Sequence, residues 1–223
     1  MIKHLGIIID GNRRWAKEKS LKPWKGHEKG AEAVDKLLDN CLELGIKEIT
    51  IYTLSTENLK RDALELEFLF KLFKSWFSRI KKDPRINENK VKIRFIGDLS
   101  LVPKDVRELA ESIEKDTSGN DNYTINFLFA YGGRLELVKA VNRLIKSGKK
   151  EITEEDITDN LWLRDEPELV IRTGGCERLS NFLPWQSTYS ELIFLKKMWP
   201  DFDKEDLLSC IKEFESRKRN FGK

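Results

Sequence analysis

Apolar positions along the 223-residue chain follow two alternating patterns. Short continuous runs rich in β-branched residues alternate with longer stretches in which apolar residues recur every three or four positions. The short runs predict six strands, at Leu5–Ile9, Glu48–Leu54, Val91–Ile96, Tyr123–Ala130, Leu169–Arg172 and Glu191–Phe194. The longer stretches predict helices at Gly30–Leu44, Asp62–Lys82, Pro103–Asp116, Arg134–Ser147, Glu154–Trp162 and Lys204–Arg219. Because most of these strands are apolar on both faces, we expect an α/β fold in which helices flank a mostly parallel central sheet.

Composition narrows the class of protein without identifying it. The chain is 39% hydrophobic and 35% charged, as in globular proteins, and no linker or repeat divides it, so we expect one domain spanning residues 1–223. Its net charge of +3 is too small to indicate nucleic-acid binding. The three cysteines are widely spaced, which disfavours a disulfide framework or a zinc site. No apolar run is long enough to span a bilayer and no signal peptide is recognisable, so a cytoplasmic protein is expected; a peripheral membrane contact stays open.

The segments that follow the strands are the first place to look for a site, because ligands of open α/β sheets bind at the carboxyl ends of the strands. These segments read DGNRRW, LSTENLKR, GDLS, YGGR and RTGGCERLSNF. Glycine, hydroxyl, amide and arginine residues recur in four of them, with Asp10 and Glu57 close by. This composition is typical of a phosphate-binding site.

The first of these segments places an anion beside two cations. A helix that begins at Gly11 or Asn12 would offer free N–H groups to a phosphate, and Arg13 and Arg14 would add paired donors. Asp10 would repel that phosphate unless a divalent cation lay between them, and Mg²⁺ suits this role. The alternative is that Asp10 caps a helix beside a pair of surface arginines.

The second arginine-rich segment surrounds a glycine pair. Arg172 ends a strand, Gly174–Gly175 would let the backbone approach a ligand, and Arg178 and Ser180 follow. The alternative is a turn with surface arginines.

Three weaker signals gain meaning only from their neighbours. LSTENLKR, which contains Ser55 and Asn58, is also an ordinary helix start, and YGGR is also an ordinary strand-to-helix turn. His27 lies close to basic residues, where a phosphate contact is plausible, and neither histidine has the spacing of a metal ligand. The usual nucleotide-binding and hydrolase motifs are absent.

The stretch that follows Asp62 has an unusually wide apolar surface. At 100° per residue, one broad arc contains Leu66, Leu69, Phe70, Leu72, Phe73, Trp76, Phe77 and Ile80. Such a surface is usually core, and the alternative is a wall for a chain-like hydrocarbon ligand. Glu65 falls inside this arc, in the first turn, where a carboxylate is favoured by the helix dipole.

Taken together, these segments resemble the cis-prenyltransferases, the undecaprenyl diphosphate synthase family. IIDGNRRWA, GHEKG, LSTENLKR, YGGR, LVIRTGG, RLSNFLPWQSTYSE and WPDF appear in family order between His4 and Gly222. The resemblance implies an α/β fold with an apolar tunnel, a homodimer, and extension of a farnesyl or geranylgeranyl diphosphate primer with isopentenyl diphosphate. The product would be a long-chain polyprenyl diphosphate, a lipid-carrier precursor for glycan or cell-envelope synthesis. The DDxxD motif of the all-helical trans-synthases is absent.

The resemblance also implies a role for individual residues. Asp10 would hold Mg²⁺ against the primer diphosphate, Glu191 would be a second Mg²⁺ carboxylate, and Ser55 and Asn58 would assist proton removal. The implied substrate-binding residues are Gly11, Asn12, Arg13, Arg14, Trp15, His27, Thr56, Glu57, Arg61, Arg172, Arg178, Leu179 and Ser180. Of these residues, Arg172, Arg178 and Ser180 would bind the diphosphate of isopentenyl diphosphate. The Leu66–Ile80 arc is the candidate wall of the tunnel.

Several positions depart from the family pattern. Pro23 stands where an arginine is common, with Lys22 or Lys25 as substitutes, and Arg13 stands where glycine is usual. Leucine replaces common aromatic residues at positions 54 and 59, and Cys176 shifts the motif glutamate to Glu177. The C-terminal arginine-x-glycine motif, which reaches the partner's site in the family, reads Asn220–Phe221–Gly222, with Arg219 one position early.

Two other classes of function compete with this interpretation. An accessory subunit that only stabilises a catalytic partner would have lost the motif residues, yet Asp10, Asn58, Arg172 and Arg178 are all present. A nucleic-acid-binding protein would use basic clusters such as Lys17–Lys29 and would show steep salt dependence, which the small net charge disfavours.

Overall fold

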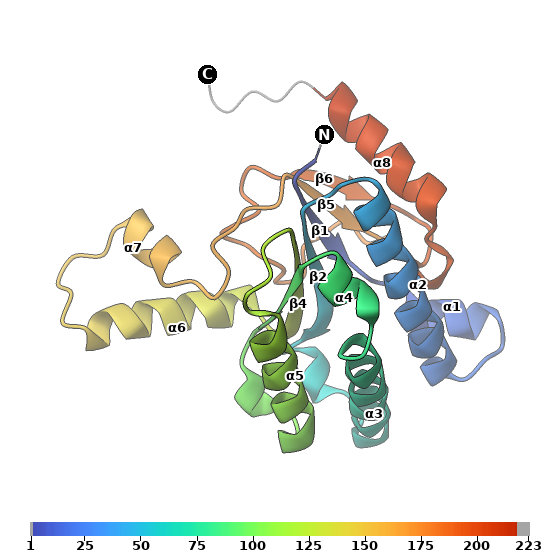
Figure 1. The fold of residues 1–223 in the computed structure, drawn as a ribbon, viewed down its shortest axis with the longest axis horizontal. Helices are drawn as coiled ribbons and strands as arrows, with labels where there is room; N and C mark the ends of the chain where they lie inside the picture. Colours follow the sequence, from blue (N-terminus) through green and yellow to red (C-terminus); the bar gives the residue numbers. More distant parts are fainter. Residues whose placement is uncertain (1, 218–223) are drawn as a thin grey trace.

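Parallel strands form the centre of the structure, a computed structural model that describes residues 2–217 (Figure 1). The described residues contain six of them: β1 (His4–Ile8), β2 (Glu48–Ser55), β3 (Val91–Ile96), β4 (Tyr123–Tyr131), β5 (Leu169–Arg172) and β6 (Glu191–Phe194). The sheet order is β3-β4-β2-β1-β5-β6, and every neighbouring pair is parallel. The predicted fold class is therefore confirmed, and each strand boundary lies within one residue of its prediction.

Helices connect most of the parallel strands, and a loop without an assigned helix, residues 173–190, joins β5 to β6. The helices are α1 (Asn12–Glu18), α2 (Pro23–Glu43), α3 (Ala63–Ile80), α4 (Pro84–Glu88), α5 (Lys104–Thr117), α6 (Gly133–Lys146), α7 (Glu154–Asp159) and α8 (Lys204–Ser216). Three short 3₁₀ helices complete the set: η1 (Asn58–Lys60), η2 (Leu99–Leu101) and η3 (Trp199–Asp201). The C-terminal residues Arg219–Gly222, which stand at the arginine-x-glycine motif of the family, lie outside the described residues. No helix between residues 2 and 217 is long and apolar enough to cross a membrane.

The two faces of the sheet are covered differently. The larger core lies under α2, α3, α5 and α8, and residues such as Ile7, Phe127 and Phe77 are fully buried in it. The smaller core on the other face contains Phe182 and Leu183, which come from a loop rather than from a helix. In Figure 1, α6 and α7 extend away from the sheet on the side opposite α2.

Helix α2 begins two turns earlier than its apolar pattern predicts. Pro23 occupies its first turn, where a proline has no N–H to lose, and two glycines follow in GHEKG. A Cβ at Gly26 would lie 2.0 Å from the carbonyl oxygen of Asn12, and one at Gly30 would lie 2.3 Å from the Asn12 side chain. The glycines therefore allow α1 to pack directly on α2, which places Asn12 and its neighbours at the end of β1.

Candidate functional site

Two adjoining cavities open where β1 and β2 end. Their volumes are about 610 and 680 Å³, and both are lined by Asp10, Asn12, His27 and Arg61. The first also contains Ser55, Glu57, Asn58, Arg172, Arg178 and Ser180, and the second contains Gly11, Arg13 and Arg14. The strand order therefore gathers most of the predicted residues into one cleft.

Asp10 lies at the centre of this cleft, between two arginines. Its carboxylate accepts from Nη2 of Arg172 at 2.9 Å and lies 3.1 Å from Nη2 of Arg14. Burial opposes ionisation of Asp10, but the Arg172 hydrogen bond and the Arg14 charge outweigh it, so the pKa of Asp10 lies below its ordinary value. Asp10 does not cap α1, since Gly11 occupies the cap position in a left-handed conformation with φ near 113°. The helix-cap alternative for Asp10 is therefore wrong.

Arg172 is a buried cation rather than a surface residue. Only 5% of its side chain is exposed, and the pairing of β1 with β5 sets it beside Ile8, two residues before Asp10. Its Nη1 donates to Ser180 Oγ at 2.8 Å and to the carbonyl of Arg178. Its Nε is buried and has no hydrogen-bond partner among the described residues. A buried N–H donor of this kind is stabilised by an anionic ligand.

A second cationic group surrounds Glu65 of α3. Glu65 accepts from Arg61 at 2.9 Å, lies 3.6 Å from Arg13 and lies 3.4 Å from Nε2 of His27. Burial, followed by the charge of Arg61, lowers the pKa of His27 to about 4. His27 is therefore neutral near pH 7, and it would contribute hydrogen bonding rather than charge to the site.

Ser55 and Asn58 hold each other at the end of β2. The Ser55 N–H donates to Oδ1 of Asn58, and the Asn58 N–H donates to Oγ of Ser55, each at 3.1 Å. This is an ordinary turn-forming arrangement, and it fixes both side chains on the cavity wall. Neither residue is a helix N-cap, since Glu57 and Asp62 occupy the cap positions of η1 and α3.

The first cavity continues from the polar cleft into an apolar space between α2 and α3. Ala31 and Val34 of α2 face Leu69, Leu72, Phe73 and Trp76 of α3 across it. Phe77 and Ile80, from the same arc, lie in the main core instead. The core interpretation is therefore confirmed for Phe77 and Ile80, and the other side of the arc lines a cavity. Leu54, at a position of family departure, also lines this cavity.

Some predicted site residues lie elsewhere. Trp15 is buried against η3, where its Nε1 donates to Asp201 at 2.7 Å, and neither Trp15, Thr56 nor Leu179 lines the two cavities. Glu191 begins β6, at the end of the sheet opposite Asp10, and pairs with Arg217 at 2.7 Å. Within one chain, the two predicted Mg²⁺ carboxylates are thus not brought together.

Sequence patterns did not single out three residues of the site. Glu65 was explained by the helix dipole alone, yet it organises three basic residues. Asn181 lines the cavity and donates to Glu57 at 2.8 Å, and its Oδ1 accepts from the backbone N–H of Arg134. Thr173 donates to the Asp10 carbonyl at 2.7 Å. No residue of the YGGR segment lines the two cavities, and Gly133 packs against Pro184, since a Cβ there would lie 2.0 Å from that ring.

The residues of the cleft suit Mg²⁺ better than a metal held by protein alone. No cluster of three or more histidine, cysteine, aspartate or glutamate side chains within residues 2–217 could hold a metal ion. Mg²⁺ commonly binds through one or two carboxylates and completes its shell with substrate phosphates and water. Asp10, a carboxylate whose pKa is lowered by the neighbouring Arg172 and Arg14, fits this pattern.

Comparison with known proteins agrees with this geometry. Residues 8–222 match the family model described as "Putative undecaprenyl diphosphate synthase". The chain is 44% identical to the geranylgeranyl-diphosphate-specific tritrans,polycis-undecaprenyl-diphosphate synthase of Methanopyrus kandleri, an alignment that covers 99% of this chain and 84% of the relative. It is also 44% identical to an isoprenyl transferase of Fusobacterium nucleatum, over 99% and 95% of the two chains.

A solved structure extends the likeness to three dimensions. Lavandulyl diphosphate synthase from Lavandula x intermedia, in complex with dimethylallyl diphosphate, superposes with a TM-score of 0.94 at 30% identity. The superposition covers 100% of this chain and 98% of that protein. The matched span, the identities and the shared fold lead to one conclusion: this chain is a prenyltransferase and belongs to the undecaprenyl diphosphate synthase family.

Proposed function

We propose that this protein lengthens an allylic diphosphate primer with isopentenyl diphosphate and releases a polyprenyl diphosphate. One observation carries the proposal. Asp10 lies between Arg172 and Arg14 at the polar end of a cavity whose other end is apolar. A prenyl diphosphate has the same division, with an anionic head and a hydrocarbon tail. The head would lie among the arginines and the tail between α2 and α3.

The reaction follows from this placement. The bond between C1 of the primer and its diphosphate oxygen breaks, C1 bonds to C4 of isopentenyl diphosphate, and C2 of that unit loses a proton. Inorganic diphosphate leaves with the bonding electrons. Arg14, Arg61 and the Asn12 region would stabilise the charge that develops on the leaving diphosphate. The free Nε and fixed Nη groups of Arg172 would orient the diphosphate of isopentenyl diphosphate with Arg178 and Ser180.

The walls of the cavity suit the cationic carbon that forms. Leu54 and Phe73 exclude water there, so the cation would react with isopentenyl diphosphate rather than with water. Ser55 and Asn58, held by their reciprocal hydrogen bonds, stand on the same wall and would assist proton removal.

Bound Mg²⁺ would neutralise charge on the primer diphosphate, and Asp10 is the residue that would hold it. A Glu191 contribution would have to come from another copy of the chain, since it lies far along the sheet from Asp10 in one chain. Homodimer formation, a cytoplasmic location and the choice between farnesyl and geranylgeranyl primers belong to the same proposal.

The test is incorporation of labelled isopentenyl diphosphate onto allylic primers of ten, fifteen and twenty carbons, with Mg²⁺ or with a chelator, and with products separated by length. We expect long products only with the metal. Asp10→Ala should lower the rate by roughly 100-fold or more, because it removes a group that acts on developing charge. Asp116→Ala is the matched control, since that exposed carboxylate pairs with Lys81 and lines neither cavity. Full activity of Asp10→Ala would refute the role of Asp10, and no incorporation by the unaltered protein would favour the accessory-subunit alternative.

A further inference from the structure

Large apolar side chains face solvent at the outer edge of the polar cleft. Trp24, in the first turn of α2, is 42% exposed, and Leu64, in the first turn of α3, is 77% exposed. Leu21, in the connection between α1 and α2, is 44% exposed. A single exposed apolar residue is ordinary on a protein surface, whereas a contiguous group of them marks a contact with something else.

These side chains form one surface. Trp24 packs across to α3 against the half-buried Phe68, with ring centroids 6.2 Å apart. Leu64 lies four positions before Phe68, so the two side chains are neighbours on the same side of α3. Leu21 lies beside them at the wall of the second cavity. We call Leu21, Trp24, Leu64 and Phe68 the rim patch.

The rim patch borders the cleft, and most of it lies outside the cleft. His27, which lines both cavities, follows Trp24 by three positions, and Arg61, which also lines both, precedes Leu64 by three. Trp24, Leu64 and Phe68 line neither cavity. A surface that covers the patch would therefore adjoin the mouth of the cleft without displacing the diphosphate-binding residues.

Lysines border the rim patch. Residues 17–29 contain five lysines and two glutamates, in a chain whose net charge is only +3. Lys17, Lys19 and Lys22 are exposed, and within residues 2–217 they form no ion pair with an acidic side chain. Nζ of Lys22 lies 5.7 Å from the centroid of the Trp24 ring, so positive charge directly adjoins an apolar member of the patch.

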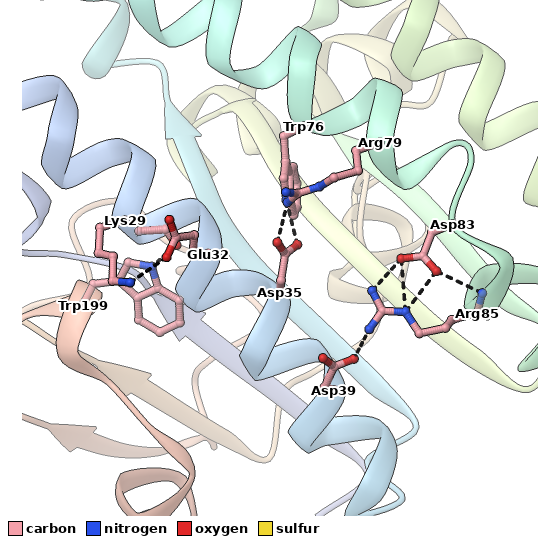
Figure 2. A network of polar contacts seen from close by, with 10 residues as sticks. Lys29, Glu32, Asp35, Asp39, Trp76, Arg79, Asp83, Arg85 and Trp199 are labelled. Carbon is pink, nitrogen blue, oxygen red and sulfur yellow. Dashed lines mark hydrogen bonds and ion pairs between the residues drawn. The ribbon is translucent and has the colours of Figure 1, made fainter.

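Further along α2, basic side chains have acidic partners. Lys29 pairs with Glu32 at 2.6 Å, and Asp35 accepts from Arg79 of α3. Figure 2 shows these pairs following one another along the helix. The lysines of the α1–α2 connection differ, because no such pair compensates their charge among the residues that the structure describes.

We propose that the rim patch and its lysines dock this protein on an anionic membrane surface, with the mouth of the cleft at the bilayer interface. Leucine and tryptophan side chains enter the boundary between headgroups and acyl chains, and anionic headgroups attract the lysines around them. Nucleic acid would engage the lysines and leave the apolar side chains without a partner, so the pattern favours a lipid surface.

The proposed function gives this contact a use. A polyprenyl chain would pass between the cavity and the bilayer without crossing water, because the apolar rim patch lies between the two. This use rests on the proposed chain-lengthening activity, whereas the docking itself does not. The inference also assigns a surface to the peripheral membrane contact that composition leaves open.

Vesicle flotation tests the docking without any turnover. The full chain is mixed with vesicles of phosphatidylglycerol and phosphatidylcholine, or with vesicles of phosphatidylcholine alone. Each lysine near an anionic surface strengthens binding by about fivefold, so the three lysines predict roughly a 100-fold preference for the anionic vesicles. Added salt should reduce that preference, because it screens exposed charges.

Matched variants assign the contact to the rim patch. Trp24→Ser and Leu64→Ser should each weaken binding to anionic vesicles by roughly tenfold, since each removes an apolar side chain that enters the bilayer. Lys22→Glu should weaken it by more than about fivefold. The controls, Leu208→Ser on α8 and Lys115→Glu on α5, make the same changes at exposed positions outside both cavities and should bind as the unaltered protein does. Thermal unfolding checks that each variant is folded.

Three outcomes of the binding arm would overturn the inference. The first is that the unaltered protein does not float with anionic vesicles, and the second is that the patch variants bind as well as their controls. The third is that a duplex oligonucleotide displaces the vesicles while Trp24→Ser leaves binding unchanged, which would favour nucleic acid as the partner.

A turnover arm separates this inference from the proposed function. Without vesicles, the initial rate with a ten-carbon primer should be the same in Trp24→Ser, Leu64→Ser and the unaltered protein, since neither residue lines the cavities. Anionic vesicles should raise the steady-state output of long products by the unaltered protein, and should raise that of Trp24→Ser less. Vesicle binding without any incorporation would refute the proposed function and leave the docking surface intact. Incorporation without vesicle binding would do the reverse.

Discussion

Gly26→Ala is the substitution for which the structure gives the sharpest expectation. A Cβ at this position would lie 2.0 Å from the carbonyl oxygen and 2.7 Å from the carbonyl carbon of Asn12, both of which are backbone atoms. It would have to retreat by about 1.4 Å to reach the 3.4 Å at which ordinary van der Waals contact begins. Because no flexible side chain can yield, α1 must move away from α2.

Two opposing effects set the size of the change in the free energy of unfolding. Alanine is favoured over glycine in a helix interior by roughly 0.5–1 kcal/mol. Overpacking of this kind costs about 1–3 kcal/mol or more, so we expect a net loss of at least about 1 kcal/mol in the free energy of unfolding. The same shift would displace Asn12 and its neighbour Arg13 by about 1 Å, and a misplacement of that size can lower a reaction rate by up to about 100-fold.

Urea unfolding tests the expected loss of stability, and the initial rate of isopentenyl diphosphate incorporation tests the expected loss of activity. Gly119→Ala is the control, because a Cβ there meets nothing within 4 Å. It should leave stability and rate unchanged. If Gly26→Ala matched the unaltered protein in both measurements, the close packing of α1 on α2 would not position the site, and the reasoning would fail.

Two further predictions concern buried ionisable residues. Burial lowers the pKa of His4 and of His27 to about 4, and at His27 the charge of Arg61 lowers it further. Both side chains titrate near 6.5 in the unfolded chain. The unfolded chain therefore binds more protons between these values, and stability should fall as the pH drops from 6.5 to 4, by up to roughly 3 kcal/mol for each histidine. Urea midpoints at several pH values test this, and His27→Gln should reduce the slope; a flat profile would contradict it. Glu136 is 1% exposed and accepts from four donors, those of Tyr131, Trp162, Leu163 and Gln186. Glu136→Ala should cost roughly 3–5 kcal/mol by leaving them unpaired, and Glu136→Gln should cost less; equal melting temperatures for the two variants would argue against this.

Local patterns were sufficient for the strands and for the composition of the site. A strand buried on both faces is apolar along most of its length, as in Leu169–Arg172, and the edge strand Val91–Ile96 alternates apolar with polar residues, so both are recognisable without their neighbours. The motif residues that follow the strands indicate the family for the same reason, because each motif is a continuous piece of chain. Helix propensity was a weaker guide: Gly26 and Gly30 argue against a helix, and only the packing of α1 explains why α2 begins at Pro23.

The relations between distant segments depend on tertiary structure alone. Asp10 and Arg172 are 162 positions apart, and they meet because β1 pairs with β5, which no local pattern encodes. The contacts of Glu65 and Trp76 likewise depend on what α2 sets opposite them, His27 at 3.4 Å in one case and Asp35 at 2.9 Å in the other. Sequence by itself determined which residues form each element and what chemistry lies at the strand ends. Tertiary packing decided which of those residues meet and which side of α3 lines the apolar cavity, because burial and contact are set jointly by segments far apart in the chain.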